Sequence, residues 1–264
     1  MIKKYIAVTW IIIKNSYIRD SKIGGYVLSK YINQFIEIFI TVTLFNIIFA
    51  NTKELAGWNY YQVLFLYFYS RTIILFDNFL FKRGINTFAK SMVRRGDYDF
   101  FLIKPINSMY LTSISSPQIY FVMTTFFYLI LAAYALLHSG VVIHLVSILW
   151  FMILSVFGFA LYYFLNIICV TPTFWFIRLY SLRNVINKAN IFMRYPLGIL
   201  PYILQFAFTI LFPIAIISNI PAVTVFYPPR MLYIVYMIAI TIIFGLIANA
   251  FWKFGQKHYS SASS

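Results

Sequence analysis

Long apolar segments separated by short polar ones form the dominant pattern of the chain. Each apolar segment is long enough to cross a hydrocarbon core of about 30 Å as a helix rising about 1.5 Å per residue. The pattern therefore predicts an all-α integral membrane protein with one domain over residues 1–264. The six expected transmembrane helices cover residues 27–50, 60–81, 111–137, 144–170, 196–218 and 231–252.

The N-terminal residues 1–25 show a different pattern, in which apolar and basic positions alternate. Ile6 and Tyr17 fall near one stripe of a helix, whereas Lys3 and Lys14 fall largely off it. This arrangement is typical of an amphipathic helix that lies in the membrane interface, with its lysines at the headgroups. The alternative is a frayed tail.

Composition and charge narrow the class further. Apolar residues make up 62% of the chain and charged residues 10%, and the mean hydropathy is +0.83, which excludes a soluble domain. Lys and Arg number 21 against six Asp and Glu. In the predicted topology, all of the cations except Lys53, Arg71 and Arg230 lie on the same side of the membrane as the N-terminus. Arg194 is among them, in the second inner loop, 171–194. This bias indicates contact with anionic membrane lipid rather than nucleic acid, and it predicts a plasma-membrane protein with both termini cytosolic.

Four charged residues fall within the expected first two spans. Glu37 and Arg71 lie at matching depths of about 15 Å, so we favour an ion pair between them. Lys30 and Asp77 also match in depth, but the angular spacing along the two helices does not allow both pairs to form well. The alternative is that each charge faces its own hydrated cleft or snorkels toward the interface.

The first inner loop, 82–110, is strongly basic and contains an acidic and aromatic cluster. We expect a short cytosolic helix over residues 86–93, closed by a left-handed glycine at Gly96. A solvated loop explains the basic residues but not the cluster, so we interpret this loop as a surface that contacts another protein. The residues expected to make the contact are Arg94, Arg95, Gly96, Asp97, Tyr98, Asp99, Phe100, Phe101, Lys104 and Pro105.

The segment between the last two spans is apolar for an outer loop. Pro213 interrupts the helix that precedes this segment, and Pro221 lies within the segment. Both prolines are therefore candidate residues of an outer gate. Irregular backbone at membrane depth is tolerated where protein surrounds it. A functional gate and an interfacial loop both remain consistent with these residues.

Catalytic chemistry is poorly supported by the sequence. It contains no G-x-x-x-x-G-K-[ST] phosphate-binding motif, so we expect no ATP hydrolysis by this chain alone. His138 and His144 are six residues apart, which does not fit a helical metal pair, and the lone Cys169 has no partner for a cysteine cluster. We therefore expect no metal site, no cofactor and no enzyme activity in this chain.

The run from Arg95 to Asn107, RGDYDFFLIKPIN, resembles the signature of permease subunits of type 2 ATP-binding-cassette exporters, in the branch with six spans and no large extracellular domain. Three further places agree in the same order along the chain, although Gln256-Lys257-His258 stands where arginines are common in the family. They are Gly57-Trp58 before Gln62-Val63, Arg194-Tyr195-Pro196 leading to Pro213 and Pro221, and Trp252 to Ala262.

This resemblance implies a half-transporter. Two such permeases, identical or related, pair in the membrane, and each rests the loop at 82–110 on a separate cytosolic ATPase that binds ATP and Mg. Residues 1–25 then correspond to the family's connecting helix, and a re-entrant pair of short helices precedes the last span. The expected function is export of a hydrophobic or amphiphilic substrate, such as a peptide, drug or lipid-like molecule. The alternative is a membrane enzyme or assembly factor that acts on lipid-linked substrates without ATP.

Overall fold

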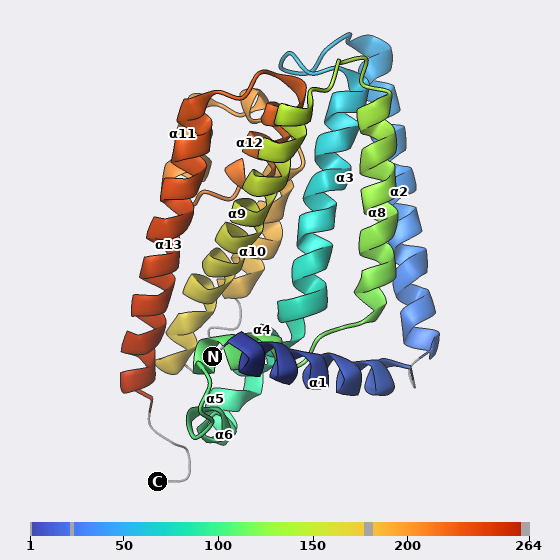
Figure 1. Cartoon of the computed structure of the whole chain (residues 1–264). Helices are drawn as coiled ribbons and strands as arrows, with labels where there is room; N and C mark the ends of the chain where they lie inside the picture. The colour runs from blue at the N-terminus through green and yellow to red at the C-terminus, as the bar shows by residue number, and fades with distance from the viewer. Residues whose placement is uncertain (1, 22–23, 177–181, 260–264) are drawn as a thin grey trace.

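The computed structural model describes residues 2–21, 24–176 and 182–259. Within these residues the regular elements are helices, and most of the long ones lie side by side (Figure 1). Five helices are long and apolar enough to cross a membrane, or six when one bent pair is counted as a span. The predicted all-α membrane fold is confirmed. The five helices are α2 (Gly24–Asn51), α3 (Tyr60–Asp77) with its continuation to Arg95, α8 (Tyr120–Leu137), α9 (Leu145–Val170) and α13 (Met231–Lys257).

Helix α1 (Ile2–Asp20) lies across one end of the bundle (Figure 1). Its orientation fits an interfacial helix, and Ile6 and Tyr17 of its apolar stripe are each 63% exposed. Residues 1, 22 and 23 of the expected segment lie outside the described residues. We refer to this end of the molecule as the α1 end.

The bundle has a central helix and a peripheral one. In the most apolar stretch of the α3 helix 78% of the residues are buried, whereas in α2 the share is 6%. Helix α3 packs against α8, α9 and α12 (Ile216–Phe226), and Tyr67 and Tyr128 are among its fully buried contacts. Helix α2 therefore lies at the periphery of the helix bundle, where it exposes side chains such as Phe39.

The predicted third span, 111–137, is wrong at its start. A short helix, α7 (Ser108–Ile114), ends before Pro117, and α8 begins only at Tyr120. Proline lacks a backbone N–H and disfavours helical geometry in the residue before it, so the chain breaks between the two helices. The break separates α7 from α8.

The predicted fifth span, 196–218, is not one helix. A helix that runs from Tyr202 to Leu211 meets α12 at an angle of 103°. Pro213 lies at the bend, where Phe212 has left the helical region with φ −134° and ψ 77°. Pro221, expected in an outer loop, lies inside α12 instead. A bent helix pair thus precedes α13, as the resemblance implied, but it begins earlier than the sequence indicated.

The segment before the bent pair also differs from expectation. Residues 171–194 were predicted to form the second inner loop, and residues 177–181 of this range lie outside the described part. The described remainder forms η3 (Thr171–Phe174), α10 (Leu182–Ala189) and η5 (Asn190–Met193). Helix α10 packs against α9, and Ile186 and Met193 are fully buried in the main core. This segment therefore enters the bundle.

Candidate coupling surface and central charge cluster

The helix that begins with α3 does not stop at the predicted boundary, Phe81. It continues for 36 residues, from Tyr60 to Arg95. At about 1.5 Å per residue it is about 50 Å long, well beyond a hydrocarbon core of about 30 Å. The helix predicted over 86–93 is present, but it continues the second span instead of standing apart from it, because wider π-helical turns carry the chain through without a break. The continuation consists of η1 (Asn78–Lys82), α4 (Arg83–Thr87), η2 (Phe88–Met92) and α5 (Val93–Arg95).

Gly96 ends this long helix. Its φ of 78° and ψ of 1° are left-handed, the geometry that the sequence predicted for a closing glycine. The chain then turns into α6 (Asp99–Leu102), where the Asp99 N–H donates to the Gly96 carbonyl over 3.1 Å. The tip of the long helix is thus a tight, hydrogen-bonded turn at the α1 end (Figure 1).

Tyr98 does not lie on the surface, where the sequence placed it. Its side chain is 0% exposed, and its ring packs against Phe88, Phe174 and Trp252 at centroid distances of 5.4, 5.3 and 6.3 Å. Burial raises the pKa of the Tyr98 hydroxyl, which remains a neutral phenol. The flanking acids misled the prediction, because Asp97 and Asp99 stay half-buried while the tyrosine between them turns inward.

The aromatic cluster around Tyr98 connects three parts of the chain. Phe88 belongs to the long helix, Phe174 follows α9, and Trp252 lies near the end of α13, with ring centroids 4.8 to 5.1 Å apart. Such close-packed aromatic contacts resist independent movement of the elements they join. The cluster therefore links the tip to the ends of both α9 and α13.

The outer face of the tip is apolar and rimmed by cations. Phe100 is 64% exposed, Leu102 38% and Ile103 79%, so three large apolar side chains are exposed within four residues, on α6 and the residue after it. A solvated loop does not require such a cluster, and exposed apolar patches of this kind mark interaction sites. Sequence reasoning omitted Leu102 and Ile103, although both stand in the quoted motif. We name the following set the tip surface: Arg94, Arg95, Phe100, Leu102, Ile103, Lys104 and Pro105.

Helix α1 is fastened to the segment that follows the tip. Lys4 donates to the Pro105 carbonyl over 3.1 Å, and the rings of Tyr5 and Tyr110 meet edge to face at 5.1 Å. Thr9 makes a hydrogen bond to the Tyr110 hydroxyl. These contacts connect the first half of α1 to the segment that follows the tip.

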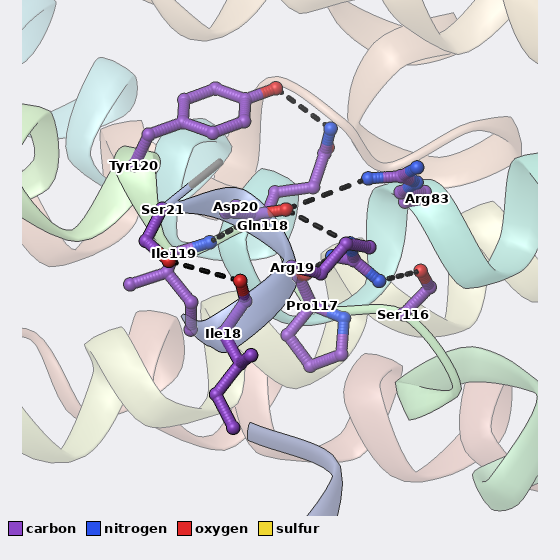
Figure 2. A network of polar contacts seen from close by, with 10 residues as sticks. All are labelled: Ile18, Arg19, Asp20, Ser21, Arg83, Ser116, Pro117, Gln118, Ile119 and Tyr120. Carbon is purple, nitrogen blue, oxygen red and sulfur yellow. Dashed lines mark hydrogen bonds and ion pairs between the residues drawn. The ribbon is translucent and has the colours of Figure 1, made fainter. Parts of the chain in front are cut away.

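The second half of α1 ends in a polar network that Figure 2 shows. Arg19 donates to Ser116 Oγ over 2.8 Å and to the Pro117 carbonyl over 2.6 Å. The Asp20 carboxylate accepts from the backbone N–H of Ile119 over 2.9 Å, at the start of α8. The Asp20 carboxylate thus accepts a hydrogen bond from one of the backbone N–H groups that have no partner within the helix at the N-terminus of α8.

The same carboxylate lies 3.7 Å from Arg83 Nη1 and 2.9 Å from Arg19 Nε. Replacing Asp20 with alanine removes all three contacts and leaves the part-buried N–H of Ile119 without this acceptor. We expect the variant to lose about 2 kcal/mol of stability, measured by thermal unfolding of the purified chain in detergent. Glu54→Ala, at an exposed position, is the control. Equal melting temperatures for the two variants would contradict this assignment.

A second polar group lies in the middle of the bundle. Arg71 Nη2 is 2.6 Å from Glu37 Oε2, the pair that depth matching favours, and 2.9 Å from Gln34 Oε1. The other carboxylate oxygen, Oε1, is 3.3 Å from Arg194 Nη1. We name Gln34, Glu37, Arg71 and Arg194 the central charge cluster.

The position of Arg194 contradicts its predicted place in a cytosolic loop. The physical reason is that η5 carries it into the bundle, where Glu37 offsets the cost of burying a cation. The signal available in the sequence was its place directly before the apolar segment Tyr195-Pro196. The other two predicted intramembrane charges lie away from this cluster. Asp77 is buried at the end of α3, and Lys30 lines a separate cavity with Lys82 and Arg83.

Aromatic rings enclose the cluster. The Arg71 guanidinium lies 5.6 Å from the centroid of the Tyr128 ring, and that of Arg194 lies 6.0 Å from the centroid of Tyr67. Both arginine Nε atoms are buried and have no hydrogen-bond partner among the described residues. Two guanidinium groups share one carboxylate, so the cluster carries a net charge of +1 when all three groups are ionised.

The described residues contain no group of three or more His, Cys, Asp or Glu side chains that could hold a metal ion. The ring centroids of His138 and Tyr134 are 4.1 Å apart, and His138 Nδ1 hydrogen-bonds the Tyr134 carbonyl. His138 therefore makes structural contacts at the C-terminal end of α8.

The geometry is that of a multi-pass α-helical membrane protein with a protruding, anchored tip and a bent helix pair before its last span. The match to a family model defines it further: the family described as ABC-2 family transporter protein covers residues 35–263. The chain belongs to this family, and the resemblance is confirmed. No curated protein and no solved structure gives a significant match to the chain.

Proposed function

We propose that this chain is the transmembrane subunit of an ATP-driven exporter that moves a hydrophobic or amphiphilic substrate out of the cytoplasm. A separate ATPase subunit binds ATP and Mg and docks on the tip surface, and a second permease, identical or related, completes the pathway. Its membership of the ABC-2 family supports a permease role. The α1 end and both termini face the cytosol, as the distribution of Lys and Arg predicts.

The observation that carries the proposal is the construction of the tip. Its outer face offers three exposed apolar side chains, while Tyr98 fixes its inner face to the ends of α9 and α13. Closure of two docked ATPase subunits would displace this tip and, through the aromatic cluster, the spanning helices. Conformational work from a partner needs such a rigid path between docking site and pathway.

The test is co-purification of the chain with an ATPase subunit from the membrane of the cell that produces it. We expect Phe100→Glu and Ile103→Glu each to weaken the association by about tenfold or more, because each places a charge in an apolar contact. Leu137→Glu is the matched control, since Leu137 is 77% exposed at the opposite end of α8. Full association by the tip variants, or ATP-independent export by the chain alone, would overturn the proposal.

Orientation has its own test. In a chain with Cys169→Ser, a membrane-impermeant maleimide added to intact cells should label Lys53→Cys and not Lys104→Cys, whereas both should react after the membrane is opened. Both positions are exposed, so accessibility within the protein does not differ. Labelling of Lys104→Cys in intact cells would reverse the topology.

A further inference from the structure

We propose that the central charge cluster binds the anionic head of a single-chain amphiphile, whose alkyl chain lies in the adjoining groove between α2 and α8. The inference rests on the proposed function and specifies the chemical class of the molecule that the permease handles. A carboxylate or phosphate head is the shared chemistry, whether it belongs to an exported amphiphile or to a membrane lipid.

Charge is the first reason. Arg71 is only 7% exposed, and Glu37 divides its two oxygens between Arg71 and Arg194, so one positive charge of the cluster has no counter-ion among the described residues. A charge at this depth is costly unless it is paired. An anion would balance the cluster, whereas a cationic ligand would have to compete with two guanidinium groups for one carboxylate.

Hydrogen bonding is the second reason. The buried Nε donors of Arg71 and Arg194 have no partner among the described residues. Guanidinium groups bind carboxylate and phosphate oxygens in a paired geometry, with charge-assisted hydrogen bonds. A head with several acceptor oxygens satisfies donors that Glu37 and Gln34 leave free. Arg194 is 27% exposed, so the cluster is open to an incoming group on that side.

The groove is the third reason. It has a volume of about 210 Å³ on the face between α2 and α8, and it is lined by Tyr31, Gln34, Phe35, Ile38, Met123, Thr124 and Phe127. Gln34 belongs to both features, because its Oε1 also accepts the hydrogen bond from Arg71 Nη2 over 2.9 Å. The groove is apolar apart from Gln34, Thr124 and the Tyr31 hydroxyl, so it suits an alkyl chain whose head reaches the arginines.

A purely structural triad of Arg71, Glu37 and Arg194 is the competing interpretation, and the two differ in the effect of Glu37→Gln. If the triad is purely structural, loss of the Glu37 charge or of the Arg194 charge should each disturb the cluster, and neither change should tighten the binding of an anion. In an anion site, Glu37→Gln raises the net charge from +1 to +2 and should tighten binding, while Arg194→Gln should weaken it. The amide that replaces the Glu37 carboxylate keeps an acceptor oxygen for the arginines.

The experiment is native mass spectrometry of the full chain released from neutral detergent, with dodecyl phosphate or dodecyltrimethylammonium added. The wild type should retain dodecyl phosphate at a concentration about tenfold lower than the ammonium compound. We expect Arg194→Gln to abolish this preference and Glu37→Gln to tighten dodecyl phosphate binding. Arg230→Gln, an exposed cation near the start of α13, should bind like the wild type.

Equal retention of the two amphiphiles by the wild type would overturn the inference, and so would weaker phosphate binding by Glu37→Gln. If Arg194→Gln does not fold, the direction of the Glu37→Gln effect still decides. An anionic lipid that co-purifies with the wild type and is lost in Arg194→Gln would identify the head as lipid. Binding of added dodecyl phosphate without such a lipid would favour an exported amphiphile over a membrane lipid as the natural occupant. Neither ATP nor the ATPase is present, so failure here leaves the test of the proposed function unaffected.

Discussion

Replacement of Glu37 by alanine is expected to destabilise the folded chain by about 3 kcal/mol. The carboxylate separates two guanidinium groups, with contacts of 2.6 Å to Arg71 and 3.3 Å to Arg194. Removing one partner of a buried ion pair costs about 3–5 kcal/mol, because the remaining charge stays buried without compensation. Glu37 is 30% exposed, so we take the lower end of this range. Thermal unfolding of the purified chain in detergent gives the measurement.

Two comparisons make this prediction specific. Glu54→Ala removes an acid at an exposed position and should leave the melting temperature unchanged. The double replacement of Glu37→Arg with Arg71→Glu restores an ion pair in reversed order and should be more stable than either single change. A Glu37→Ala chain as stable as Glu54→Ala would show that the cluster contributes nothing to the fold.

The spanning helices were predictable because long apolar runs have one stable form in hydrocarbon, a helix with all its backbone groups paired. The same reasoning failed for the segment that contains α10 and η5. It carries Asn184, Asn187, Lys188, Asn190 and Arg194, so its hydropathy indicates a polar loop. The fold buries it with polar contacts from other helices, such as the 3.0 Å bond from Asn190 to the Tyr162 hydroxyl. Such pairings join residues far apart in the sequence and leave no local pattern.

At the tip too, features set by neighbouring residues were predictable from the sequence, whereas features set by distant contacts were not. Gly96 was predictable as a helix end because the left-handed geometry is a local preference of glycine. The inward turn of Tyr98 was not, because it depends on Phe88, Phe174 and Trp252, which three separate elements supply. The continuous helix to Arg95 was missed for a related reason. Tertiary packing of Ile85 and Phe88 stabilises helical turns that the polar sequence alone does not favour.

The close approach of α4 to α7 provides the second prediction of a large effect. A Cβ atom at Gly84 would lie 2.3 Å from the Ser113 carbonyl oxygen and 2.5 Å from that of Thr112. Both are backbone atoms of α7, so no side-chain rotation relieves the overlap. Gly84→Ala must therefore separate the two helices, and we expect a loss of about 3 kcal/mol, at the upper end for an overpacked site.

Gly25→Ala is the matched control, because the same methyl group added there meets no atom within 4 Å. Within α2 this change should stabilise the chain by up to about 1 kcal/mol, since alanine favours the helix over glycine. Opposite shifts in the thermal unfolding of the two variants are thus expected from one chemical change. The α4–α7 contact joins the tip to the segment that holds α1, so Gly84→Ala should also reduce ATP-dependent export under the proposed function. A Gly84→Ala chain that melts at or above the wild-type temperature would mean that α4 and α7 do not pack this closely.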